Sequence, residues 1–253
     1  MAINKVEYNG NTLIDLTNDT VTPETLAKGV TAHDKSGAEI VGTMESGGGS
    51  SDLARQIFEE RTFSDDTLTE IPADGFRGWQ AIEHIYMPRV TSVGQYACYN
   101  CTGLLEIDLP ACETIGNYSF YNNTSVTSVN LPNLKSTGTN CLRQLTALQE
   151  VTLPSLNTLG GTAFQKCTSL ERVDLPVCKS IGANAFNGCS VLATLILRSS
   201  TVCTMANVNA LTGTPIASKT GIVFVNDSLV DTYKSASNWS TYASQIKGLS
   251  ELI

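Results

Sequence analysis

A 22-residue repeat without insertions or deletions constrains the fold of this chain more than any other feature. The dipeptide Leu-Pro recurs at this spacing, and Met87-Pro88 and Leu197-Arg198 extend the series to five steps of 22. The four complete pairs are Leu109-Pro110, Leu131-Pro132, Leu153-Pro154 and Leu175-Pro176. Self-similarity at this period indicates a solenoid in which each repeat packs on its neighbours.

Apolar residues keep the same step in several columns. One column runs Ile71, Val93, Ile115, Thr137, Leu159 and Ile181, and a glycine follows each of its last five members. A second column runs Phe76, Cys98, Phe120, Leu142, Phe164 and Phe186. We expect these columns to form continuous apolar ladders in the core, because a single 22-residue repeat is too short to bury its own apolar face.

Each repeat has a readable local pattern. Residues 104–109 alternate inward apolar with outward acidic side chains, which is strand periodicity. Gly116 marks a turn, since glycine tolerates positive φ, and residues 117–122 suggest a short helical turn with Phe120 pointing inward. The sequence predicts six rungs in one continuous right-handed parallel sheet. Its strands centre on Ile85, Ile107, Val129, Val151, Val173 and Leu195.

The full motif is Ile-Gly-x-x-Ala-Phe-x-x-Cys-x-x-Leu-x-x-Val-x-Leu-Pro, with its best copies starting at Leu159 and Ile181. Over residues ~60–218 it resembles the BspA-like class of leucine-rich repeat. The resemblance implies a non-enzymatic surface or interaction protein. Two rows depart from the motif, one with Thr137, Leu142 and Leu145 and one with Cys98. We expect repacking to absorb both.

The regions outside the repeat divide the chain further. Residues 45–51 form a Gly/Ser linker, residues 52–67 an N-terminal cap, residues 68–218 the solenoid and residues 219–253 a strand-helix cap. Residues 1–44 form a small α+β module with a β-hairpin.

The N-terminal module carries a second resemblance. The sequence of this module predicts a strand over 12–16, a short helix from Thr22-Pro23 and a hairpin over 31–44. The segment 29–44 resembles a small module at the N-termini of phage tail and tail-fibre proteins. This resemblance implies that residues 1–44 attach the protein to other tail proteins.

The C-terminal cap consists of a strand over 222–225 and one broken helix or two over 227–246. Its buried face contains Leu229, Tyr233, Trp239, Tyr242 and Ile246. It resembles the terminal cap of such repeats in gut bacteria and their phages. An alternative is that Trp239 and Tyr242 bind a ligand.

Charge and hydropathy exclude several classes of protein. The 253 residues carry a net charge of −8, which makes nucleic acid an unfavourable partner. No apolar run approaches the roughly 18 residues needed to span a bilayer, so no membrane insertion is expected. Residues 1–10 lack the apolar segment of a Sec signal peptide.

Catalytic chemistry is not indicated. The chain has two histidines and no phosphate loop, dinucleotide fingerprint or hydrolase elbow. We therefore expect no enzyme activity, no cofactor and no metal. The Cys98-x-x-Cys101 pair allows a zinc or redox reading, but both positions fall in buried columns. Cys167 and Cys189 share a column where a disulfide is geometrically possible. We expect reduced, buried thiols.

Two surfaces are candidate binding sites. The first is a two-by-two patch of Tyr96, Tyr99, Tyr118 and Tyr121, surrounded by Asn100, Asn117 and Asn122. It would form if each tyrosine pair shares a face of a helical turn and the rows stack. Tyrosine and asparagine together suit sugars and resemble paratope chemistry. The alternative is that tyrosines fold inward to fill space beside Cys98.

The second candidate is the open face of the strands, where repeat proteins bind ligands. The alternative is a solvated sheet face. Its outward columns are His84, Glu106, Ser128, Glu150, Arg172, Thr194 and Tyr86, Asp108, Asn130, Thr152, Asp174, Ile196.

The leading functional hypothesis is a phage or prophage tail protein, assembled in the bacterial cytoplasm into the virion, whose solenoid recognises a host cell-surface glycan or protein. The alternative is a bacterial cell-surface adhesin or interaction protein of the same repeat class.

Overall fold

The computed structural model describes residues 5–8, 11–15, 31–33, 39–41 and 61–252, and the chain divides into two units, 1–60 and 61–253. In the first unit, β1 (Lys5–Tyr8) pairs antiparallel with β2 (Asn11–Asp15), and β3 (Thr31–His33) with β4 (Glu39–Val41). The second pair agrees with the predicted hairpin over 31–44. The helix from Thr22, the linker 45–51 and residues 52–60 of the N-terminal cap lie outside the described residues.

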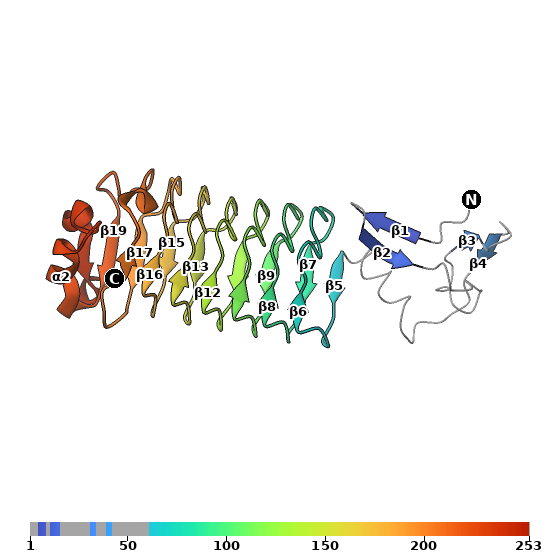
Figure 1. The fold of residues 1–253 in the computed structure, drawn as a ribbon. Helices are drawn as coiled ribbons and strands as arrows, with labels where there is room; N and C mark the ends of the chain where they lie inside the picture. Colours follow the sequence, from blue (N-terminus) through green and yellow to red (C-terminus); the bar gives the residue numbers. More distant parts are fainter. Residues whose placement is uncertain (1–4, 9–10, 16–30, 34–38, 42–60, 253) are drawn as a thin grey trace. The chain divides into compact units, whose positions relative to one another are not determined.

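The second unit is a solenoid whose rungs follow one another from β5 to α2 (Figure 1). One strand per rung forms a parallel ladder in the predicted register, such as Val151 opposite Val173. The first four of these strands are β5 (Thr62–Ser64), β7 (His84–Tyr86), β9 (Glu106–Asp108) and β11 (Ser128–Asn130). The next five are β13 (Glu150–Thr152), β15 (Arg172–Asp174), β17 (Thr194–Leu197), β19 (Ile222–Val225) and β20 (Ile246–Gly248). The predicted solenoid, strand centres and parallel pairing are confirmed.

The prediction of one continuous sheet is wrong in one respect. Within the described residues, β5 to β11 form a four-stranded sheet and β13 to β20 a separate five-stranded sheet. Val129, the centre of β11, is only half-buried, whereas Ile107 and Val151 beside it are buried. The ladder therefore stops at a strand whose central residue is less buried than those of its neighbours.

A second parallel sheet, which the sequence reasoning missed, follows the first around the solenoid. It has seven strands and joins the rungs that the first sheet leaves separated. Its strands are β6 (Glu70–Ile71), β8 (Ser92–Val93), β10 (Thr114–Ile115), β12 (Ser136–Thr137), β14 (Thr158–Leu159), β16 (Ser180–Ile181) and β18 (Thr204–Met205).

The glycine that follows five of these strands, β8 to β16, has a different cause from the one expected. Gly116 and Gly138 do not adopt positive φ. A Cβ added to Gly138 would lie 2.6 Å from the backbone nitrogen of Asn117 in the preceding rung. The glycine is thus required by the close approach of successive rungs, not by backbone handedness.

The segments expected to be short helices are overlapping turns. Residues 95–100 and 117–122 carry two left-handed residues each, four positions apart. The amide of Tyr99 donates to the carbonyl of Tyr96 at 3.0 Å within the turn. Alternate amides donate to the next rung, as from Cys98 to the Ser119 carbonyl at 2.7 Å. The turns therefore stack as a third hydrogen-bonded ladder, and the predicted helical geometry is wrong.

The core contains the predicted columns. Phe120 points inward and is 1% exposed, and the departures Cys98, Leu142 and Leu145 are fully buried. Buried Thr137 uses its hydroxyl to accept the amide of Gly160 at 2.7 Å, so repacking does absorb the irregular row.

The C-terminal cap closes the solenoid with polar tips on buried rings. Tyr233 accepts the amide of Cys203 at 2.7 Å, and the Trp239 indole donates to the Cys203 carbonyl at 2.6 Å. The Tyr242 hydroxyl donates to the carbonyl of Val208 at 2.7 Å. Trp239 and Tyr242 are buried, so they are structural and the ligand-site alternative is wrong.

The expected helix over 227–246 is also shorter than predicted, because Ile246 belongs to β20 and extends the sheet. The helical pieces are η2 (Val208–Leu211), η3 (Asp227–Leu229), α2 (Val230–Ser235), η4 (Ser240–Gln245) and η5 (Leu249–Glu251).

Candidate ligand-binding face

Four tyrosines meet on the turn ladder that follows β8 and β10. The rings of Tyr96 and Tyr118 stack at 5.1 Å between centroids, and those of Tyr99 and Tyr121 at 4.9 Å. Within each rung the rings lie 5.6 and 5.8 Å apart in tilted or edge-on contact. All four side chains are half-buried. We call this group the tyrosine quartet.

Two arginines, which the sequence analysis did not single out, extend the tyrosine quartet at both ends. The guanidinium of Arg77 lies 4.8 Å from the ring centre of Tyr96 and 5.3 Å from that of Tyr99. The guanidinium of Arg143 lies 5.4 Å from the ring centre of Tyr121. Such contacts contribute about 0.5–1 kcal/mol at exposed sites. The signal was available, because these arginines share the column of Tyr99 and Tyr121 at steps of 22.

The two arginines differ in their partners. Arg77 forms an ion pair with Asp74 at 2.7 Å, and this hydrogen bond raises the pKa of Arg77. Arg143 donates to the side-chain oxygen of Asn140 at 3.0 Å, and its Nε is buried without a hydrogen-bond partner. One end of the quartet is thus charge-neutralised, and the other holds a cation bonded only to a neutral amide.

The backbone beneath the quartet is unfavourable for tyrosine. Tyr96 and Tyr118 have φ of 55° and 56°, in the left-handed region. The equivalent positions in other rungs are Asp74, Asn140 and Asn184, which are residue types that tolerate this region, and the β-branched Thr162, which is not. The repeat therefore does not select tyrosine here, and the aromatic side chains need another reason.

Asparagines line the quartet as expected. The Asn122 amide donates to the side-chain oxygen of Asn100 at 2.7 Å, and both residues are half-buried. The side-chain oxygen of Asn117 accepts from the amide of Thr139 at 2.8 Å and from its hydroxyl at 3.0 Å. Polar amides thus border the aromatic surface.

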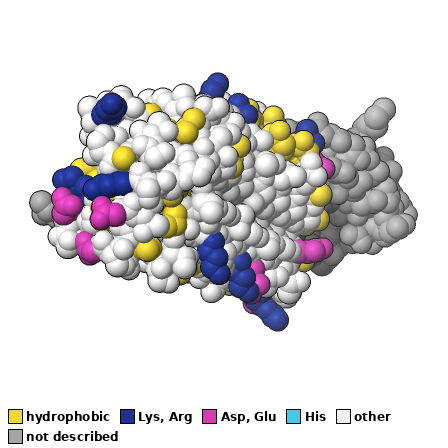
Figure 2. Space-filling view, turned by 60° about the vertical axis from the view of Figure 1, so that its left-hand side comes forward, with side chains coloured by type: hydrophobic (Ala, Val, Ile, Leu, Met, Phe, Trp, Pro, Cys, Tyr) yellow, Lys and Arg dark blue, Asp and Glu magenta, His cyan; other side chains and the backbone are white. Residues whose placement is uncertain are grey.

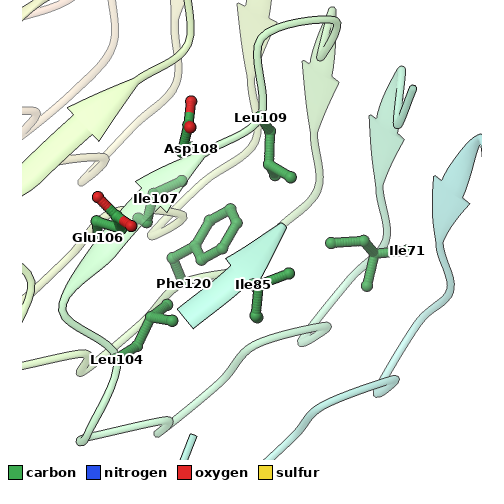
Figure 3. A pocket seen from close by; sticks show the side chains of 8 residues that line it. All are labelled: Ile71, Ile85, Leu104, Glu106, Ile107, Asp108, Leu109 and Phe120. Atoms are coloured by element: carbon green, nitrogen blue, oxygen red, sulfur yellow. The ribbon is translucent and has the colours of Figure 1, made fainter. Parts of the chain in front are cut away.

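The tyrosines do not fold inward to replace the missing Phe at Cys98. Beside the rung of Cys98 the core instead retains a cavity of about 10 Å³, room for about one water molecule (Figure 3). Ile71, Ile85 and Phe120 contribute to its lining. This apolar cavity is too small for a glycan or a protein ligand.

The outward strand columns are less open than predicted. Tyr86 is 52% exposed, but Glu106 contacts His84 at 3.1 Å and Asp108 accepts from the amide of Asn130 at 2.7 Å. A space-filling view shows charged side chains in small separate groups on a mostly uncharged surface (Figure 2).

Two expected members of this face are not available. Asp174 is 9% exposed because Arg198 covers it, with its Nη2 2.8 Å from a carboxylate oxygen. Ile196 is fully buried. The structure therefore removes Asp174 from the candidate ligand-binding residues. Ligand binding by Tyr86, Glu106 and Asp108 remains a prediction.

The eight cysteines are all free and buried. Burial raises the pKa of Cys112 to about 11 and that of Cys141 to about 12. Burial likewise raises the pKa of Cys98 and Cys167 well above the ordinary value. Among the described residues, no three metal-ligating side chains gather into one group.

None of the helices in the described residues combines the length and apolar character needed to cross a bilayer.

The comparisons with known proteins concern the solenoid. The family model of the BspA type leucine-rich repeat region matches six copies, over residues 69–193 and 113–221. A leucine-rich repeat protein of T. pallidum is similar to this chain at 28% identity and a TM-score of 0.50, over 55% of this chain and 67% of its own.

A second solved structure, a leucine-rich repeat protein of Bacteroides ovatus, matches at 26% identity and a TM-score of 0.46, over 58% of this chain and 45% of its own. No curated protein matches the sequence. The family match begins at residue 69, and no comparison supports the phage-tail resemblance of residues 1–44.

Proposed function

The chain belongs to the BspA-type leucine-rich repeat family, whose repeats generally serve in non-catalytic binding proteins. On that premise we propose that it is a cell-surface adhesin or interaction protein, and that the tyrosine quartet binds a glycan. Of the two hypotheses drawn from the sequence, the surface adhesin is the better supported, since the family match concerns the solenoid alone.

The stacked rings of the quartet are the observation that carries this proposal. A sugar has apolar C–H groups that can contact the outer edges of these rings, and hydroxyls that hydrogen-bond to amides. The quartet offers both, because Asn100 and Asn122 border rings that are half-buried and still reach the surface. Tyrosine also supplies rigid contact area at low entropic cost.

The unfavourable backbone strengthens the proposal. Left-handed φ at a bulky residue costs about 1–2 kcal/mol, whereas asparagine visits this region readily. Tyr96 and Tyr118 are retained where other rungs use Asp74 or Asn140. Strain of this kind occurs at functional sites where the surrounding structure sustains it.

A phage tail protein is the second candidate function, and the resemblance of residues 29–44 to tail modules favours it. In that case residues 1–44 attach the protein to the tail, and the solenoid binds the host surface. The neighbouring genes distinguish the two readings, with tail and lysis genes expected for a phage and secretion and sortase genes for an adhesin.

A glycan array probed with the full chain tests the proposal. We expect binding to a subset of glycans, loss of that binding for Tyr99→Ala, and normal binding for Val177→Ala, which removes an exposed apolar side chain outside both candidate surfaces. Failure of the wild-type protein to bind any glycan on the array would contradict the proposal and favour a protein ligand.

A further inference from the structure

We propose that the tyrosine quartet, defined as Tyr96, Tyr99, Tyr118 and Tyr121, selects sugars that carry a carboxylate, and that Arg143 is the residue that recognises it. This inference rests on the proposed function and adds the chemical class of the ligand. It follows from the difference between the two ends of the quartet.

The quartet is the centre of a four-row array. The outer rows pair Asp74 with Arg77 and Asn140 with Arg143, and each outer arginine donates to the acidic or amide side chain of its own row. Asn140 holds the position that Asp74 holds in the other outer row, so its row carries one negative charge fewer. The array therefore carries a net positive charge, located at Arg143.

Arg143 has donors to spare. A guanidinium has five N–H donors, and within the described part of the chain that of Arg143 hydrogen-bonds to Asn140 alone. No carboxylate lies within ion-pair distance of it among the described residues. Its Nε is buried and unpartnered, and so is Oε1 of the adjacent Gln144. Because Nε is buried, only the Nη groups of Arg143 can reach a ligand.

The position of Arg143 suits an acidic sugar. Its guanidinium lies over the ring of Tyr121, 5.4 Å from the centroid. The rings of Tyr99 and Tyr121 face each other, and Arg77 and Arg143 cover their outer faces. A pyranose lying across the ring edges would place a ring substituent beside Arg143. Arginine binds carboxylates bidentately through its planar fork. At the other end, Asp74 already occupies Arg77 and repels a second carboxylate.

The test uses the full chain and matched probe pairs on one array: sialyllactose with lactose, and oligogalacturonate with its methyl ester. We expect the wild type to bind at least one carboxylated member roughly tenfold more tightly than its neutral partner, as a charge-assisted contact implies. Arg143→Gln should lower the affinity for the carboxylated probe to the affinity for its neutral partner. Arg143→Lys should recover only part of the preference, because it keeps the charge and loses the planar fork.

Two further variants sharpen the result. Asp74→Asn releases Arg77 from its ion pair and should increase the preference for the carboxylated probe. Arg89→Gln removes an exposed arginine outside the array and should leave it unchanged. Equal binding of both members of every pair, or a preference that survives Arg143→Gln, would overturn this inference while the proposed function stands. Binding of no probe at all would overturn both.

Discussion

The rings of Tyr99 and Tyr121 lie 4.9 Å apart with an angle of 6° between their planes, although the two residues are 22 positions apart in the sequence. This parallel stacking follows directly from the repeat, since each rung places the same position over the last. A column of the sequence thereby becomes a stack of aromatic rings, which presents ring edges to a ligand. The proposed function requires that these rings bind a ligand and that the fold does not need them.

The strained backbone of the quartet gives a first prediction. Tyr96→Asn places a residue tolerant of left-handed φ at this position, and it removes ring contacts worth about 0.5–1.5 kcal/mol each. We expect these effects to offset, so that the free energy of unfolding changes by no more than about 1 kcal/mol, while glycan binding falls. Urea denaturation and array binding of the same preparation measure both. A loss of several kcal/mol would mean that Tyr96 is a structural residue.

The glycine column gives a second prediction. A Cβ on Gly138 meets the backbone of residues 116 and 117 at 2.6 Å, and backbone atoms cannot move aside as a flexible side chain can. Gly138→Ala should therefore force two rungs apart and destabilise the solenoid by several kcal/mol. The matched control is Gly161→Ala, whose nearest contact is 3.3 Å. Equal melting temperatures for the two variants would contradict the close-approach explanation.

The cap gives a third prediction. Tyr233→Phe removes only the hydroxyl that accepts the amide of Cys203 and leaves that buried N–H without a partner. An unsatisfied buried donor costs about 1–3 kcal/mol. Thermal unfolding should show this loss with the far-UV spectrum unchanged. A fully stable Tyr233→Phe variant would show that the cap does not depend on this bond.

The buried thiols give a fourth prediction, which depends on pH. The pKa values of Cys112 and Cys141 are raised to about 11 and about 12 in the fold, against about 8.5 when unfolded. The folded state therefore retains these protons as pH rises past 8.5, and the unfolded state releases them. The contribution of these two thiols to the free energy of unfolding is therefore fully present below about pH 8.5, and it declines from about pH 9 to 12.

Iodoacetamide at pH 8 should accordingly label few of the eight cysteines in the native protein and all of them after denaturation. Mass spectrometry counts the labels. Native disulfides seen without reductant would contradict the expectation of reduced thiols.

The repeat made the solenoid, the strand centres and the stacked quartet predictable from the sequence. Each depends only on which residues share a column, and the 22-residue step defines the columns. The quartet was predicted although its premise was wrong, because rung-to-rung stacking brings Tyr96 over Tyr118 whether the segment is a helix or a turn.

Other features depend on backbone geometry that apolar periodicity does not encode. The second sheet has two residues per strand, too few to show an alternation. The stacked turns carry left-handed residues four positions apart, and their asparagines resemble those of a helix end. The break after β11 coincides with partial exposure of Val129, which its residue type does not reveal.

Contacts that violate the period were also beyond the sequence. Arg198 covers Asp174 from 24 residues away, after the repeat has begun to decay. The alternation of a strand predicts that the outward residue Asp174 is exposed to solvent. Only the structure shows that Arg198 covers it.

The central claim is that the quartet is a binding surface. The most direct measurement compares wild type with Tyr99→Ala/Tyr121→Ala for glycan affinity and for the free energy of unfolding. The account predicts that glycan binding is abolished and that stability falls by less than about 2 kcal/mol, because half-buried rings contribute little to the core. Phe164→Ala is the control, since this fully buried ring should cost about 3–5 kcal/mol. Normal glycan binding by the double mutant, or a stability loss as large as that of Phe164→Ala, would contradict the account.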